Sequence, residues 1–258
     1  MEPRFAVTLT TRNNAPTIRA CLASIRDDVQ GIGEIVVVDA ASTDGTAAIL
    51  AELAGEWPEL RVVEEALNRG RGRNRSVELT RAPVVLTQVD ADNVYRRGSL
   101  RAAAEAVASG DSDLLLVEGE HDPNPSCTRC YGWKRAAFDR VGGYPPVQYE
   151  EDLAIVREAI ARGLKIAAFR VDRLGDDLKE RGVAAYQLPA HRRLPAVVRA
   201  ARMFRQVGYR YPEYVRFLWL TRRGAGHFAA ATGLGAYAYL RPNGPTAQGG
   251  RGSAPAGE

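Results

Sequence analysis

The chain has 258 residues, 45% of them hydrophobic and 26% charged, so it can bury a sizeable core and suits one large domain or one domain with an appendage. Its net charge of +4 is uneven, because residues 190–258 carry eleven Arg, no Lys and two acids (+9) while the remainder is −5. Three cysteines exclude a disulfide framework, and the single Cys127-x-x-Cys130 lacks the second ligand pair of a structural zinc site, so we interpret both as ordinary loop thiols.

Apolar runs and helical patterns alternate from the first residues onward. The N-terminus runs straight into an apolar stretch without a basic flank and a long apolar core, so we expect a cytoplasmic chain. Strands are predicted at residues 5–10, 35–38, 60–64, 84–89, 113–118 and 165–171. Helices are predicted at residues 16–26, 46–53, 73–80, 98–109, 133–141 and 153–164, the last with Leu153, Val156, Ile160 and Leu164 as its apolar positions.

This alternation with short connections predicts an α/β fold with an open, mostly parallel, twisted sheet flanked by helices. Residues 121–131 are predicted to form a loop, and residues 172–181 a solvated loop or helix face. Ligands of such sheets bind at the carboxyl ends of the strands.

Two carboxylates end the apolar run at residues 84–89. If the strand continues that far, Asp90 and Asp92 point to the same side and could hold a hard divalent cation with its phosphates. The alternative is a turn or a helix cap, in which Asp is equally favoured.

A segment at residues 68–75 interleaves two glycines with four arginines. We interpret it as a loop in which glycine permits close approach to a phosphate and arginine neutralises it, although loop arginines are often only solvated. Further on, Gly142 and Gly143 form either a mobile hinge or a helix stop. Glu151 and Asp152 then precede a helix, where acids are expected for the helix dipole alone as well as for catalysis.

The cationic end is predicted to form a basic, aromatic helical extension over residues 191–242 and a disordered tail over 243–258. Seventeen uncharged residues, 224–240, are at the lower edge of a membrane span, so a packed hairpin or an interfacial helix pair is favoured over a span. Such a cationic region could meet anionic lipid, lipid phosphate or nucleic acid.

Taken in order, these motifs resemble the inverting family 2 glycosyltransferases of GT-A fold, over residues 5–166. The elements that carry the resemblance are residues 37–46, Asn68-Arg69-Gly70 with Arg73-Asn74, Asp90-Ala91-Asp92, and Gly142-Gly143-Tyr144 followed by Glu151-Asp152. The resemblance implies a catalytic domain over residues 1–190, with a nucleotide-binding half to about residue 95 and an acceptor half over 96–190.

The resemblance also implies roles for individual residues. Asp39 would bind the base of a UDP- or GDP-sugar in a pocket lined by Thr10 and Arg12, and Asp90 would face the ribose or the phosphates. Asp92 would ligate Mg²⁺ or Mn²⁺, with His191 as a further candidate ligand. The diphosphate would meet the segment of Asn68 and Gly70 through Arg71 or Arg73. Asp152, beside Glu151, would be the general base, and Gly142, Gly143 and Tyr144 would form an acceptor loop.

The sequence departs from the family at several points. Ala40 replaces the usual second acid after Asp39, the Gly/Arg segment is about two residues short, and no Gln-x-x-Arg-Trp of the processive synthases is present. The leading hypothesis is a metal-dependent, inverting transfer of one sugar to an acceptor hydroxyl, which a phosphorylated lipid at the inner face of the membrane could carry. A sugar-1-phosphate nucleotidyltransferase and a non-catalytic nucleotide- or lipid-binding module are the alternatives; nucleic acid is a less favoured partner. The base, sugar, acceptor and oligomeric state stay open.

Overall fold

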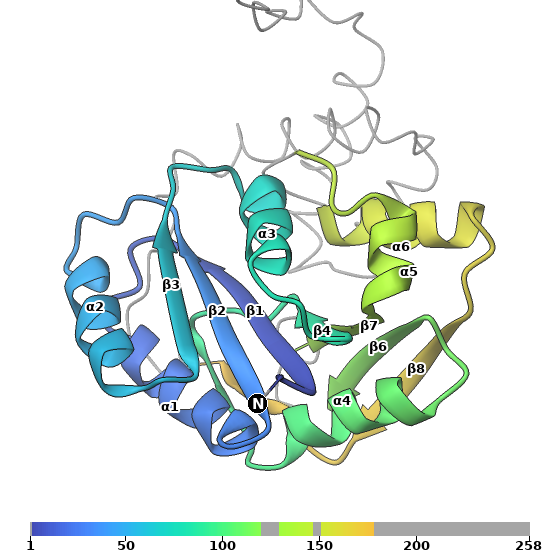
Figure 1. The fold of residues 1–258 in the computed structure, drawn as a ribbon, viewed down its shortest axis with the longest axis horizontal. Coiled ribbons are helices and arrows are strands. Elements are labelled where there is room, and N and C mark those ends of the chain that lie inside the picture. The colour runs from blue at the N-terminus through green and yellow to red at the C-terminus, as the bar shows by residue number, and fades with distance from the viewer. Residues whose placement is uncertain (1, 120–128, 147–150, 178–258) are drawn as a thin grey trace, which may run out of the picture. The chain divides into compact units, whose positions relative to one another are not determined.

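A seven-stranded sheet forms the centre of the computed structural model, which describes residues 2–119, 129–146 and 151–177. The strands run in the order β3-β2-β1-β4-β7-β6-β8 (Figure 1). Their bounds are β1 Phe5–Thr11, β2 Gly33–Asp39, β3 Leu60–Glu64, β4 Val84–Thr87, β6 Leu114–Gly119, β7 Arg129–Lys134 and β8 Ile166–Val171. A second, two-stranded sheet pairs β5 (Asn93–Tyr95) with β9 (Gly175–Asp177).

Within the seven-stranded sheet, all neighbouring strands are parallel except at β7, which is antiparallel to both β4 and β6. The predicted open and mostly parallel sheet is therefore confirmed. From β1 the chain moves outward through β2 and β3 and then returns to place β4 on the other side of β1. This reversal of strand order is a topological switch point, where open α/β sheets bind ligands.

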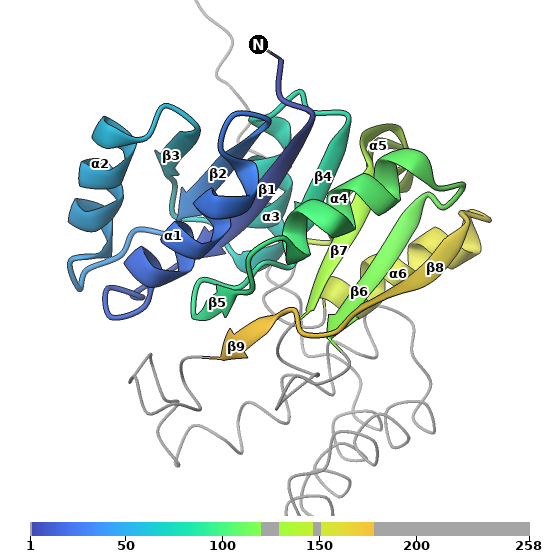
Figure 2. The same cartoon turned by 90° about the horizontal axis from the view of Figure 1, so that it is seen from below.

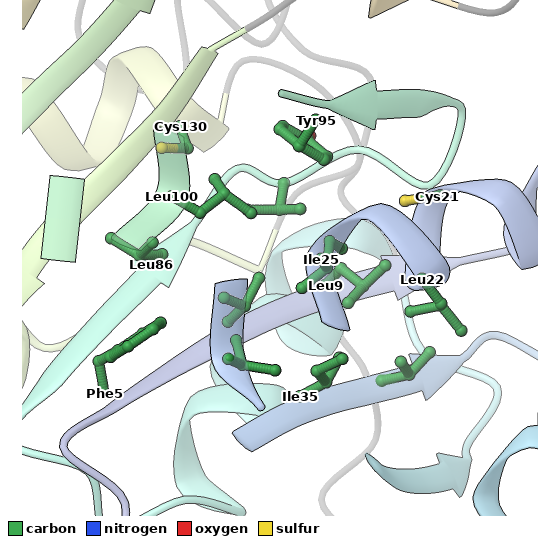
Figure 3. Close-up of a cluster of buried hydrophobic side chains, with 14 of the residues drawn as sticks. Phe5, Leu9, Cys21, Leu22, Ile25, Ile35, Leu86, Tyr95, Leu100 and Cys130 are labelled. Carbon is green, nitrogen blue, oxygen red and sulfur yellow. The ribbon is translucent and has the colours of Figure 1, made fainter. Parts of the chain in front are cut away.

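Helices cover both faces of the sheet (Figures 1 and 2). They are α1 Ile18–Val29, α2 Thr46–Glu56, α3 Arg69–Glu78, α4 Ser99–Ser109, α5 Arg135–Val141 and α6 Glu151–Ala161. The core on one face joins the sheet to α1, α2 and α4 and includes Leu9, Ile25 and Leu86 (Figure 3). The core on the other face joins it to α3, α5 and α6. In β1, β4 and β6 alternate residues contribute to the two cores, which explains why these strands appear in the sequence as continuous apolar runs.

Asp28 shows how the helices are fixed to one another. This buried residue near the end of α1 accepts hydrogen bonds at its carboxylate from the backbone N–H groups of Gly98, Leu100 (2.9 Å) and Arg101 (3.3 Å). Those groups begin α4 and have no partner within that helix. A carboxylate from one helix therefore caps the positive end of another.

Several boundaries differ from the sequence prediction. The strand predicted at 84–89 ends at Thr87, and the helix predicted at 133–141 begins at Arg135 because the preceding residues form β7. The prediction of a loop over residues 121–131 is therefore wrong at its end, because residues 129–131 belong to β7 and Cys130 is buried in the core. In α6, Ile155 and Ala159 are buried while Ile160 is 64% exposed, so the predicted apolar face was partly wrong.

The remaining predictions concern the rest of the chain. The extension at 191–242, the tail at 243–258 and Cys127 lie outside the described residues. Within the part of the chain that the structure describes, no helix is long and apolar enough to cross a membrane.

Candidate functional site

The carboxyl ends of β1, β2 and β4 bring the first group of predicted site residues to one edge of the sheet. Thr10 is paired in register with Val38 near the end of β1, and Asp39 is the last residue of β2. Arg12 follows β1 and is exposed, whereas the Asp39 side chain is buried.

Two loops at this edge are joined by side chains. The carboxylate of Asp39 accepts hydrogen bonds from the backbone N–H (3.1 Å) and the hydroxyl of Ser42. That hydroxyl oxygen accepts from the N–H of Asn13 (2.8 Å), whose own side chain accepts from the N–H of Thr43 (2.8 Å). Asn13 and Ala41 have φ of 55° and 54°, a left-handed conformation that is uncommon without glycine. Asp39 is therefore held in place by the loop that follows it, and the sequence did not identify Ser42 or Asn13 as its partners.

The Gly/Arg segment is not a loop but the first turns of α3, which corrects the sequence prediction. Asn68 caps the helix by accepting a hydrogen bond from the N–H of Arg71 (3.0 Å). Gly70 is buried, and a Cβ on Gly72 would lie 2.8 Å from the methyl of Thr10. Gly72 thus serves the close packing of helix on strand. The exposed Arg69 and Arg71 stand at the positive end of the helix, an arrangement that suits an anion.

Arg73 points in the opposite direction, into the protein. Its guanidinium is 5% exposed and lies between two carboxylates, at 3.1 Å from Glu151 Oε1 and 3.6 Å from Asp90 Oδ1. Burial lowers the pKa of Arg73, but Asp90 and Glu151 more than offset that influence, so its pKa is raised and it stays charged. Of the two arginines that the sequence left open for the diphosphate, Arg71 is the exposed one.

Glu151 and Asp152 begin α6 but differ in environment. Glu151 is 2% exposed, and its Oε2 has no hydrogen-bond partner among the described residues. Burial raises the pKa of Glu151, while Arg73 and Arg69 oppose that rise. Asp152 is partly exposed. Glu151 is therefore an internal partner of Arg73, and Asp152 is the acid of the pair that faces solvent.

Asp90 and Asp92 lie in a turn rather than on a strand. The chain leaves β4 through Gln88, whose φ is 61°, and the N–H of Asn93 donates to the carbonyl of Asp90 at 3.3 Å. The Asp90 side chain is 48% exposed, whereas Asp92 is buried. The argument from strand alternation therefore does not apply to this pair.

The two carboxylates suit one kind of metal ion. No group of three or more His, Cys, Asp or Glu within the described residues could hold an ion, and His191 lies outside them. Magnesium is commonly bound through one or two carboxylates together with substrate phosphates. Asp90 and Asp92 fit an ion that arrives with a diphosphate better than a permanently held one.

The predicted acceptor loop packs against α3. Gly142 is the C-cap of α5 with φ of 85°, so the helix-stop interpretation is confirmed. Tyr144 is buried, and its hydroxyl lies 2.6 Å from Thr87 Oγ1 at the end of β4. The side chain of Asn74 bonds the backbone of Tyr144, a contact that sequence reasoning missed because seventy residues separate the two.

Comparisons with known proteins agree with this geometry. The model of the family described as Glycosyl transferase family 2 matches residues 6–125. The PGL/p-HBAD biosynthesis glycosyltransferases of Mycobacterium bovis and Mycobacterium tuberculosis are 29% identical over 124 residues, which are 47% of this chain and 44% of theirs. The chain thus spans less than half the length of the curated relatives it matches.

Solved structures share the fold. A mannosyltransferase from Pyrobaculum calidifontis in complex with GDP-Man and Mn²⁺ aligns with a TM-score of 0.63 and 20% identity, covering 93% of this chain and 72% of that one. Glucosyl-3-phosphoglycerate synthase from Mycobacterium tuberculosis, with Mn²⁺ and UDP-Glc, aligns at 0.60 and 18%, covering 81% and 80%. These findings agree with the resemblance in the motifs: over residues 6–125 the chain is similar to glycosyl transferase family 2 proteins, and its sheet has the GT-A fold.

Proposed function

We propose that the chain is a glycosyltransferase that moves one sugar from a nucleotide-diphosphate sugar to an acceptor hydroxyl. One observation carries the proposal. The carboxyl edge of the sheet at the switch point gathers Asp39, Asp90 and the first turn of α3, and Arg73 joins this group to the helix of Asp152 through Glu151. A donor-binding edge and a candidate base thus share one network of contacts.

The donor would bind along this edge. Asp39 would contact the base, with Thr10 and Arg12 beside it, and Asp90 would contact the ribose or the phosphates. The diphosphate would lie at the N-terminus of α3, near Arg71, where the positive end of the helix dipole and the exposed guanidinium groups favour negative charge. Arg73 would support this site from its buried position in α3, because its guanidinium is already paired with the carboxylates of Asp90 and Glu151.

A divalent ion, Mg²⁺ or Mn²⁺, would be held by Asp92 and Asp90 together with the diphosphate. When bound, such an ion stabilises the negative charge that develops on the leaving diphosphate. The chain's own contribution is to hold the two carboxylates in the tight turn after β4, with the N–H of Asp90 donating to the hydroxyl of Tyr95 (2.9 Å).

Asp152 would take the proton of the acceptor hydroxyl as that oxygen attacks the anomeric carbon. Attack from the side opposite the leaving diphosphate inverts the configuration at that carbon. Glu151 is less suited to this step, because it is buried and its charge is shared with Arg73. We therefore assign the base role to Asp152 and a supporting role to Glu151.

The acceptor and the place of action are proposed from the charge of another part of the chain. The basic segment at 190–258 motivates an acceptor on a phosphorylated lipid, at the inner face of the membrane. Co-sedimentation with anionic liposomes should be lost on deletion of residues 194–258. Equal binding by the full and shortened chains, or no binding by either, would argue against it.

A nucleotide screen tests the proposed function itself. UDP, GDP and their sugars are tested with and without Mn²⁺. Only the nucleotides whose base the protein recognises should raise its melting temperature, because ligand binding to the folded state stabilises that state. Asp92→Ala should remove the metal-dependent shift, whereas Asp152→Asn should keep the shift and abolish transfer. Asp111→Asn, an exposed acid after α4, is the control.

The products separate the remaining alternatives. Release of nucleoside diphosphate supports the proposal, and release of pyrophosphate would identify a sugar-1-phosphate nucleotidyltransferase instead. A chain that binds no nucleotide under any of these conditions would be a non-catalytic module.

A further inference from the structure

The side-chain amide of Asn74 forms two hydrogen bonds with the backbone of Tyr144. Its Nδ2 donates to the carbonyl oxygen of Tyr144 at 2.9 Å, and its Oδ1 accepts from the N–H of the same residue at 2.7 Å. One amide side chain thus satisfies both backbone groups of one residue, as a neighbouring strand would. The 143–146 segment is held in this way by α3.

Gly143 makes this contact feasible. A Cβ at this position would lie 2.6 Å from Asn74 Oδ1 and 3.0 Å from its Cγ, so a larger residue would displace the amide. Gly143 also has φ of 77°, which disfavours any residue with a side chain. Its neighbour Gly142 has φ of 85° but open space around its Cβ position. The two glycines therefore share the same backbone requirement and differ in the collision with Asn74.

Two further contacts tie the same segment to the donor side of the sheet. Asn68, the cap of α3, donates from Nδ2 to the carbonyl of Pro146 at 3.0 Å, and the Tyr144 hydroxyl contacts Thr87 of β4 at 2.6 Å. Residues 143–146 are thus held from both the first turn and the middle of α3. A displacement of this short rigid helix would reach them directly.

We propose that Asn74 is a positioning residue that couples donor occupancy at the first turn of α3 to the conformation of residues 143–146. This inference rests on the proposed function, in which the diphosphate binds at that turn. A nucleotide that orders the N-terminus of α3 then also orders the segment predicted as the acceptor loop, because Asn74 transmits the position of the helix to the backbone of Tyr144.

Hydrogen exchange at the Tyr144 amide tests the coupling in the full chain. Pro145 and Pro146 have no N–H, so this amide reports the segment cleanly. In the wild type, UDP or GDP with Mn²⁺, whichever binds by calorimetry, should slow exchange there by about fivefold or more, the size of a typical coupling between sites. In Asn74→Ala the exchange should be faster and should no longer respond to nucleotide, while nucleotide affinity stays within about twofold.

A merely structural role would give a different result, since exchange in Asn74→Ala would rise equally with and without nucleotide and the fivefold response would survive. That outcome would overturn the proposal. Gly143→Ala should also abolish the response, and Gly142→Ala, with the same backbone strain but no collision, should retain it. Equal behaviour of the two glycine variants would likewise overturn it. If the wild type binds neither UDP nor GDP, the proposed function fails as well, and calorimetry reveals this before any variant is compared.

Discussion

The buried pair of Arg73 and Glu151 leads to a sharp prediction about stability. Removal of one partner leaves the other charge unpaired in the interior, which typically lowers the free energy of unfolding by about 3–5 kcal/mol. Arg73→Met should approach this range, because Glu151 is 2% exposed and, among the residues that the structure describes, would keep only Arg69, at 3.9 Å. Glu151→Met should cost less, about 1–3 kcal/mol, because Arg73 retains Asp90 at 3.6 Å.

The double variant Arg73→Met, Glu151→Met should lie within about 2 kcal/mol of the wild type, because apolar replacement of a buried pair is often neutral. Urea unfolding at neutral pH measures all three variants, and the coupling energy should be about 2–4 kcal/mol. As a control, Arg19 and Glu52 lie 2.6 Å apart but are half exposed, so their coupling should be no more than about 0.5 kcal/mol. Additive losses at Arg73 and Glu151 would refute the reasoning.

The same pair gives a pH dependence with a defined sign. Burial raises the pKa of Glu151 above its ordinary value of 4.5, so the folded state binds a proton more readily than the unfolded state. This contribution to stability therefore falls as pH rises from about 4.5 through the raised pKa. Arg73→Met removes an opposing positive charge, so the fall should extend to higher pH in that variant and vanish in Glu151→Gln. A variant Arg73→Met whose stability follows the wild-type pH profile would contradict this.

Three further predictions concern other parts of the fold. Asp28→Ala should lower the free energy of unfolding by about 2–3 kcal/mol by leaving the first N–H groups of α4 without their acceptor, whereas Asp27→Ala, an exposed neighbour, should change it little in urea titrations. Cys21 and Cys130 should resist iodoacetamide at pH 8 in the native state, since both are buried and burial raises their pKa values, that of Cys130 to about 12; mass spectrometry showing rapid labelling would contradict this. Tyr144→Phe should cost about 1 kcal/mol of stability through the lost contact with Thr87, and an unchanged thermal midpoint would show that the contact contributes nothing.

The strands of the parallel half were predictable because their apolar runs are long enough to be buried on both faces. The end of β2 at Asp39 and the end of β1 near Thr10 followed from that pattern. Strand β9 was not predictable, since it consists of one glycine and two aspartates and pairs with β5, another three-residue strand that lies far earlier in the chain. Strand β7 was not predicted either. Its aromatic and glycine residues are followed by Lys134 and resemble the start of α5, the helix that comes next.

The positions of the candidate site residues along the chain were easier to predict than their contacts. Sequence order named Asp39, Asp90 and Asp152 as candidates, and their roles stay predictions, but it described the Gly/Arg segment as a phosphate-binding loop, whereas that segment is the start of α3. An arginine is buried only where a partner compensates its charge, and the partner of Arg73 lies seventy-eight residues away in α6. Local sequence carries no signal for such a contact, nor for the one between Asn74 and Tyr144.

The antiparallel strand β7 also determines where the chain can be divided. Strand β4 pairs with β1 on one side and with β7 on the other. The segment matched by the family ends at residue 125, before β7 begins at Arg129. A fragment cut at that boundary would retain the donor edge but leave the outer side of β4 as an open row of backbone donors and acceptors, the kind of edge that recruits other chains and promotes aggregation. Expression of the donor half as a separate unit therefore requires residues 129–134, because they close the edge on which Asp90 and Asp92 depend.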